Sequence, residues 1–132
     1  MIYYKKRRHY KYTLLANYQQ QTELAPAQSI STPFISLDMD GLLIIKKGYA
    51  WDGPSGPTID TANFMRGSLV HDALYQLMRE KHLEQEHREY ADRLLREICI
   101  EAGMSNARAW WVYQGVRIGG ASSARPDLLQ AP

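Results

Sequence analysis

The stretch GYAWDGPSGPTIDTANFMRGSLVHDALYQ, from Gly48 to Gln76, decides how this chain folds. It begins as a loop rich in glycine and proline and then changes into an apolar pattern that carries a histidine and an aspartate side by side, His71 and Asp72. Apolar residues at helical spacing predict a helix from about Ala62 to Lys81. The loop therefore marks the point where the chain changes from one kind of secondary structure to another.

The residues before the loop alternate between apolar and polar positions, which predicts β-strands. One run extends from Arg8 to Tyr18, and the polar residues Gln19–Ser29 are expected to form a loop. Two further runs, Phe34–Met39 and Leu42–Tyr49, are joined through an Asp-Gly pair at positions 40–41, which is typical of β-hairpins. The sequence predicts a small antiparallel sheet of three strands.

The residues after the first helix predict two more helices. The second is expected from about Leu83 to Ala102, antiparallel to the first, and Ser105 is placed to cap the third. The fold class is therefore α+β: a small N-terminal antiparallel sheet, the Gly/Pro loop, an antiparallel helical hairpin and a third helix. We expect a single domain over residues 1–118 and a C-terminal tail over 119–132, where no periodic pattern is present.

Composition excludes several classes of protein. The chain has 132 residues, 45% of them hydrophobic and 23% charged, and it has no apolar run of the length that a membrane span needs. A net charge of +2 does not favour nucleic acid as a partner. Cys99 is the only cysteine, so no internal disulfide can form, and its apolar neighbours predict a buried side chain.

The helical hairpin is expected to bring His71 and Asp92 together. His71 lies about ten residues before the turn near residues 81–82 and Asp92 about ten after it, so both should lie ~15 Å from the turn. Tyr75 follows His71 by four residues and shares its face of the helix, whereas Asp72 points about 100° away. The three residues could form a base with its orienting carboxylate, or a buried polar cluster that fixes the register of the helices.

Two other features allow more than one interpretation. The run KKRRHYKY, residues 5–12, is basic with interleaved tyrosines. It could bind phosphate groups, or it could protect a sheet edge against aggregation, and we favour the second. Trp110 and Trp111 are adjacent on a helix and cannot both face one core, so at least one of them is expected at the surface or at an interface.

The motifs WDGP, LVHDALY and YAD resemble the core of the phospholipase A2 superfamily, and above all its disulfide-free version on parvovirus capsid proteins. That resemblance implies a catalytic role for His71 as the general base that activates water toward an ester carbonyl. It implies that Asp92 orients His71 and that Tyr75 donates a hydrogen bond to Asp92.

The same resemblance implies a calcium ion. Asp72 would supply a carboxylate, and the loop that follows the sheet would supply further oxygen ligands. The implied metal-binding residues are Asp72, Trp51, Gly53, Ser55 and Gly56. The loop is one residue longer here than the usual Gly-x-Gly of that superfamily.

GYAWDGPSGPT together with SLVHDALYQ also resembles a family of small phage and prophage proteins of unknown function, the domain of unknown function 1353, from Leu14 to about Gly119. Two functions are therefore expected. The first is a phage-encoded, calcium-dependent hydrolase of lipid esters that acts at a phospholipid or membrane surface. The second is a non-enzymatic virion or assembly protein of the tail, neck or capsid, which keeps the His-Asp scaffold and contacts other phage structural proteins or its own copies. Because no signal peptide is recognised, synthesis in the cytoplasm of the host bacterium is expected, with incorporation into the virion under the second function.

Overall fold

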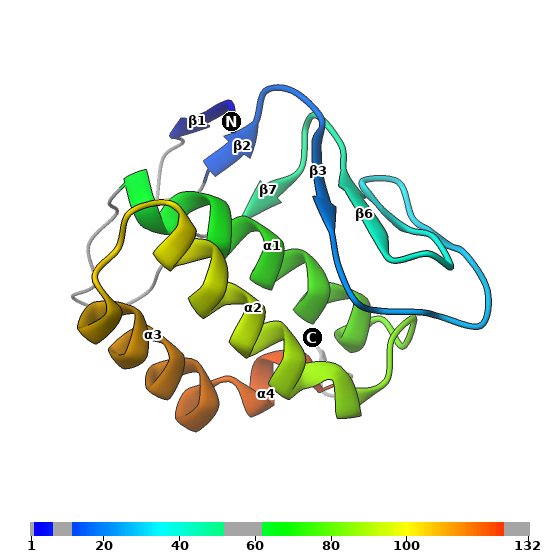
Figure 1. The fold of residues 1–132 in the computed structure, drawn as a ribbon. Coiled ribbons are helices and arrows are strands. Elements are labelled where there is room, and N and C mark those ends of the chain that lie inside the picture. Colours follow the sequence, from blue (N-terminus) through cyan, green and yellow to red (C-terminus); the bar gives the residue numbers. More distant parts are fainter. Residues whose placement is uncertain (1, 7–11, 52–61, 126–132) are drawn as a thin grey trace, which may run out of the picture. The chain divides into compact units, whose positions relative to one another are not determined.

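The computed structural model describes residues 2–6, 12–51 and 62–125. The chain divides into two compact units, Met1–Ile59 and Asp60–Pro132, the first built from strands and the second from helices (Figure 1). The strand pairs of the described residues are all antiparallel, so the predicted α+β class is confirmed. A single domain over 1–118 stays a prediction.

The first unit contains two small sheets rather than one sheet of three strands. The three-stranded sheet has the order β1 (Tyr4–Lys6), β2 (Tyr12–Leu14) and β7 (Ala50–Trp51). The four-stranded sheet has the order β3 (Tyr18–Gln21), β6 (Leu42–Ile45), β5 (Ile35–Leu37) and β4 (Ile30–Ser31).

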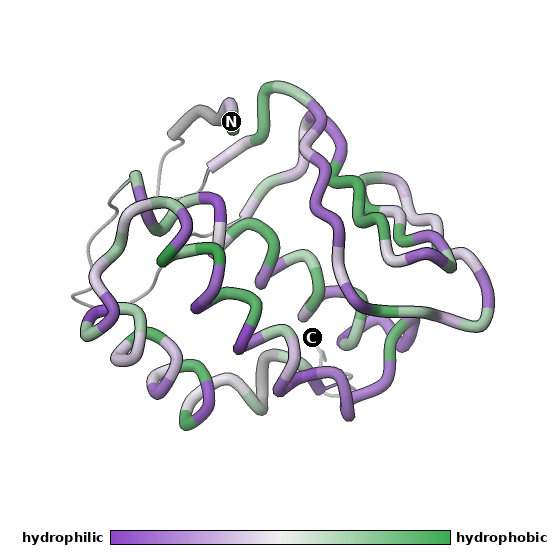
Figure 2. Tube along the Cα trace, viewed as in Figure 1, coloured by the Kyte–Doolittle hydropathy of each residue, from purple (hydrophilic) through white to green (hydrophobic). Residues whose placement is uncertain are grey.

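The hairpin between β5 and β6 follows the sequence prediction. Gly41 has a φ of 91°, a left-handed conformation that glycine adopts without strain. The Asp38 carboxylate accepts hydrogen bonds from the backbone N–H groups of Asp40 and Leu42, at 2.9 and 3.0 Å. The turn thus sets the register in which Leu37 lies opposite Leu43. Figure 2 shows the apolar character of β6 as a continuous green segment.

The predicted run from Arg8 to Tyr18 is wrong in one respect, because a bend at Leu15–Ala16 divides its described part into two strands. Alternation continues through a bend, so the periodicity gives no sign of it. The prediction that Gln19–Ser29 is entirely loop is also wrong, because Gln19–Gln21 belong to β3. This strand lies at the edge of its sheet, where polar side chains meet water and the usual apolar signal of a strand is weak.

Trp51 lies at the end of the first unit's described residues and is 3% exposed. Its ring lies 5.5 Å from the ring of Tyr12 and 6.4 Å from that of Tyr49, measured between centroids. This aromatic group fixes β7 beside β2. Its side chain therefore has a packing role within the first unit.

The second unit consists of helices, and Figure 1 shows α2 between α1 and α3. The helices are α1 (Ala62–Arg79), a 3-10 turn η2 (Gln85–His87), α2 (Arg88–Glu101), α3 (Asn106–Gly119) and α4 (Ala121–Ala124). The α1–α2 turn is close to its predicted position, although α2 begins later than Leu83 because the 3-10 turn precedes it. The hydroxyl of Ser105 accepts a hydrogen bond from the Arg108 N–H at 3.2 Å, so the predicted N-cap is confirmed.

Helix α4 was not predicted from sequence, since four residues are too few to show a period. It lies within the expected tail, whose residues 126–132 are outside the described part of the chain.

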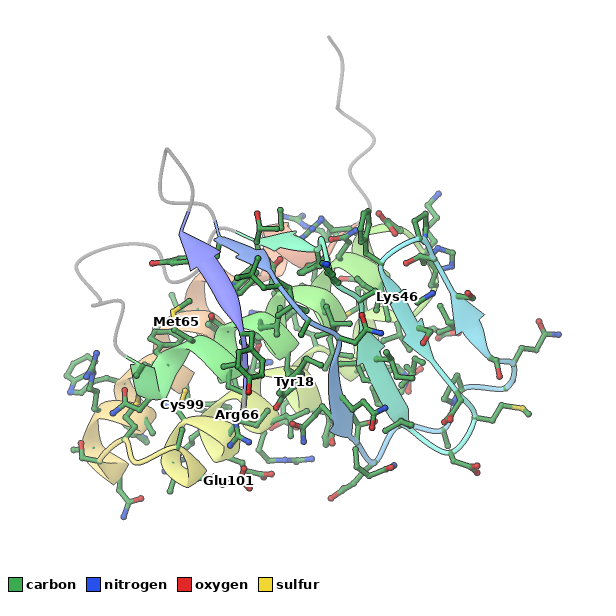
Figure 3. All side chains as sticks on the ribbon, turned by 90° about the horizontal axis from the view of Figure 1, so that it is seen from above. Tyr18, Lys46, Met65, Arg66, Cys99 and Glu101 are labelled. Atoms are coloured by element: carbon green, nitrogen blue, oxygen red, sulfur yellow. The ribbon has the colours of Figure 1, made fainter. Side chains whose placement is uncertain are left out.

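Helices α1 and α2 approach closely at Gly67. A Cβ atom at this position would lie 2.9 Å from Leu95 Cδ1 and 3.0 Å from Cys99 Sγ. The Cys99 side chain is fully buried, as predicted, and burial raises the pKa of its thiol to about 11. An ion pair between Arg66 and Glu101 joins the two helices at the same end, and Figure 3 labels both side chains.

The packing of α3 against the hairpin leaves much of this helix exposed. Ala109 of this helix belongs to a buried cluster with Phe64, Leu95, Cys99 and Met104, and Val112 and Val116 pack against that cluster. Trp110 and Trp111 are both at the surface, 44% and 70% exposed, and Ile118 is 83% exposed. Among the described helices, none has the length and apolar composition to cross a membrane.

Candidate functional site

His71 on α1 and Asp92 on α2 meet across the helical hairpin, as their distances from the turn predict. The His71 Nε2 atom lies 2.7 Å from Asp92 Oδ1. Asp92 is completely buried, whereas the His71 side chain retains 14% of its exposed surface. The imidazole therefore has one nitrogen in the interior of the helical unit and an edge that solvent can reach.

Tyr75 completes the group that the sequence predicted. Its hydroxyl donates to the same Oδ1 atom of Asp92 at 2.6 Å, and its ring lies 4.1 Å from the imidazole of His71 between centroids. Burial, and after it the hydrogen bond to Asp92 and the charge of that carboxylate, raises the pKa of the Tyr75 hydroxyl well above its ordinary value. Tyr75 is therefore a donor throughout the neutral pH range.

The charge state of Asp92 decides which nitrogen of His71 carries a proton. Burial alone would raise the pKa of the Asp92 carboxyl, but the hydrogen bonds that it accepts outweigh burial and lower its pKa. An ionised carboxylate can only accept, so the Nε2 atom of His71 must be the donor. In the neutral ring, Nδ1 then holds the lone pair, and none of the described residues bonds to it. That atom has the character of a base.

Two arginines complete the cluster, and sequence reasoning missed both. Arg117 Nη1 donates to Asp92 Oδ2 at 2.8 Å, which pairs the buried charge. Arg88 Nε donates to the Tyr75 hydroxyl at 3.1 Å. Arg88 precedes Asp92 by four residues on α2, so a shared helix face was a usable signal. Arg117 lies on a third helix, and no spacing in the sequence connects it to Asp92.

Arg88 also holds the end of α3. Its Nη2 atom donates to the backbone carbonyls of Val116 and Arg117, at 2.9 and 2.7 Å. These carbonyls belong to the last turn of the helix, where the Val116 carbonyl also accepts the backbone N–H of Gly120 at 2.9 Å. The positive charge of a guanidinium is also stabilised here by the negative end of the helix dipole. Arg88 thus places Arg117 where it reaches Asp92.

Gly120 allows this close approach. A Cβ atom here would lie 2.6 Å from the Tyr75 hydroxyl oxygen and 2.5 Å from the Val116 carbonyl oxygen. Both contacts are far shorter than van der Waals distances, so a side chain at this position would displace the end of α3 or the tyrosine. The cluster therefore depends on a glycine that local sequence patterns do not single out.

Of the five predicted calcium ligands, the structure describes only Trp51 and Asp72. Asp72 is half-buried and already takes part in a polar or electrostatic interaction. Trp51 is described, but Gly53, Ser55 and Gly56 lie outside the described residues. Among the residues described, no three His, Cys, Asp or Glu side chains form a group that could hold a metal ion. Asp72 alone does not supply the six to eight oxygens that calcium prefers, and the loop residues expected to supply the others are not described, so the calcium site stays a prediction.

The fold and the cluster define a small α+β protein with a His-Asp-Tyr group at the centre of a helical hairpin. Residues 29–116, two thirds of the chain, match the family described as Protein of unknown function (DUF1353), and the chain belongs to that family. The matched region includes the described members of the cluster except Arg117 and Gly120. No curated protein and no solved structure matches the chain.

Proposed function

We propose that this chain is a hydrolase of phospholipase A2 type that uses His71 as a general base on lipid esters. One observation carries the proposal. The Nε2 atom of His71 is bound to a fully buried carboxylate, while Nδ1 has no partner among the described residues and the side chain is 14% exposed. A histidine that serves packing alone gains nothing from an unsatisfied nitrogen at an accessible edge.

The reaction uses this arrangement directly. His71 Nδ1 removes a proton from a water molecule, and the water oxygen attacks the carbonyl carbon of the ester. The tetrahedral intermediate collapses, the bond to the alcohol oxygen breaks, and the imidazolium returns its proton to that alcohol. Asp92 stabilises the imidazolium and fixes its tautomer, and Tyr75 holds Asp92. An acid and an alcohol leave, so water is the only other reactant.

Calcium in this proposal would polarise the ester carbonyl and stabilise the negative charge of the intermediate. The loop around Trp51 to Gly56 is the expected source of its oxygen ligands together with Asp72. Because the described residues do not complete such a site, no step above depends on the ion.

A lipid substrate is supported by the surface of α3. Trp110, Trp111 and Ile118 are exposed apolar side chains on one short helix. Tryptophan favours the boundary between water and lipid, because its ring is apolar and its N–H is polar. A phage-encoded protein with this activity would act on the host envelope during penetration or lysis.

The proposal is tested by assaying the purified chain on phospholipid vesicles with a cleavable fluorescent acyl chain, in calcium and in chelator. The decisive variant is His71→Gln, which keeps an amide donor for Asp92 but has no base. We expect a loss of activity of about 10²- to 10⁴-fold. His82→Gln is the matched control, because the His82 side chain is 42% exposed and takes no part in the cluster. Equal rates for the two variants, or no hydrolysis by the native chain, would overturn the proposal.

A second candidate is a non-enzymatic virion or assembly protein, in which the cluster fixes the packing of the helices. The observation in its favour is that Asp92, completely buried, accepts bonds from α1 and α3 at once. Under this function the native chain hydrolyses no ester and associates with its own copies or with other phage structural proteins. Sedimentation of the native chain, compared with Trp111→Ser, measures that association through an exposed residue.

A further inference from the structure

A hollow of 440 Å³ lies beside the cluster, on the side of Asp92 that carries Arg117. It is bounded by the beginning of α2, the end of α3 and α4, and its lining includes three arginines and two glutamates. These are Arg88, Arg117, Arg125, Glu86 and Glu89. Its volume is within the range of small-molecule sites, roughly 300–1,000 Å³. His71 does not line it, so it is distinct from the accessible edge of the imidazole.

Two of the three guanidinium groups have donors to spare. Arg117 uses Nη1 for Asp92, and its other N–H groups have no partner among the described residues, although the side chain is 31% exposed. Arg125 is exposed and forms no ion pair with any described residue. Arg88 has fewer N–H groups available, because it already donates hydrogen bonds to the Tyr75 hydroxyl and to two backbone carbonyls.

The two carboxylates do not neutralise these arginines. Glu89 is engaged elsewhere, since its oxygens accept from Arg93 Nη1 at 3.3 Å and from the Tyr113 hydroxyl at 3.2 Å. Glu86 is exposed and has no ion pair within the described part of the chain. The lining therefore offers three guanidinium groups against two carboxylates, and one of those guanidiniums, that of Arg117, is positioned and its charge offset by the buried Asp92.

We propose that this hollow binds a small anion that carries a phosphate or carboxylate group, with Arg117 and Arg125 as its principal ligands. A guanidinium presents paired N–H donors that match two oxygens of such a group, and ionised partners form the stronger hydrogen bonds. Asp92 fixes Arg117 in position before the ligand arrives, so little side-chain freedom is lost on binding. The same chemistry is present in a free phosphate compound and in a lipid headgroup. The inference does not depend on hydrolysis by His71.

Calorimetric titration of the full chain with inorganic phosphate at low ionic strength tests the site. Arg125→Gln removes an exposed ligand without touching the cluster, and we expect affinity to fall about tenfold. Glu86→Gln removes an exposed opposing charge, and affinity should rise about threefold. Lys47→Gln is the control for loss of one positive charge outside the hollow and should leave affinity unchanged. A general charge effect would also give opposite signs for Arg125→Gln and Glu86→Gln, so the unchanged affinity of Lys47→Gln is the result that assigns the effect to the hollow.

Amide NMR shifts locate the bound phosphate. The shifts of Gln85 and Ala121, which also line the hollow, should move with saturation in the native chain. Titrations with glycerol phosphate and with vesicles of anionic phospholipid distinguish a free phosphate compound from a lipid headgroup. If the hollow binds headgroups, the vesicles should bind more tightly than glycerol phosphate. The proposal is overturned if phosphate does not bind at millimolar concentration, if Arg125→Gln binds as the native chain does, or if the shifts lie elsewhere.

Discussion

Replacing Tyr75 with phenylalanine removes one oxygen from the centre of the cluster and leaves the aromatic ring in place. The side chain is 3% exposed, so water cannot take over the hydrogen bonds of the lost hydroxyl. Asp92 loses the shorter of the two bonds to its Oδ1 atom, and the Arg88 Nε–H loses its acceptor. A hydrogen bond to a charged group contributes about 1.5–3 kcal/mol, and His71 and Arg117 still hold the carboxylate. We therefore expect Tyr75→Phe to lower the free energy of unfolding by about 2 kcal/mol.

The matched control is Tyr113→Phe. The Tyr113 hydroxyl also donates to a carboxylate, that of Glu89 at 3.2 Å, but this pair lies at the surface. Its loss should cost less than about 0.5 kcal/mol. Urea denaturation followed by circular dichroism gives both values, provided that the slope with urea concentration stays the same. If Tyr75→Phe is no more destabilising than Tyr113→Phe, the hydroxyl does not bind a buried carboxylate and the reasoning about the cluster is wrong.

Two further predictions concern the same helical unit. The pKa of Asp92 is lower in the folded chain than its ordinary value of 3.8, so its contribution to stability is present above that value and is lost as pH falls through the folded pKa. Asp92→Asn should therefore be less stable than the native chain by about 3 kcal/mol at neutral pH, with a difference that shrinks in acid below pH 3.8, and a difference independent of pH would contradict the assignment. Gly67→Ala should destabilise by about 1 kcal/mol, because its Cβ would meet Leu95 and Cys99 at 3.0 Å or less. Gly115→Ala, whose Cβ would meet nothing within 4 Å on an exposed helix, should stabilise by about 0.5–1 kcal/mol, and thermal unfolding of both variants decides whether the signs differ.

Much of the fold was accessible from local signals. The Asp-Gly hairpin, the start of α1 and the cap at Ser105 depend on residues that are close in sequence and act on their own backbone. The bend at Leu15–Ala16 and the strand formed by Gln19–Gln21 were not accessible in this way. Both depend on which partner strand is available, and that is decided by the rest of the sheet.

The candidate site divides in the same manner. The sequence by itself determined that His71, Tyr75 and Asp92 would meet, because two antiparallel helices joined by a short turn fix the height of each residue. Only the tertiary structure decided that Arg117 pairs with Asp92. Only the tertiary structure decided that the backbone at Gly120, which follows α3, lies too close to the Tyr75 hydroxyl for a side chain. The direction in which a third helix crosses a hairpin follows from how side chains such as Ala109 and Val116 pack, and no repeat in the sequence encodes that packing.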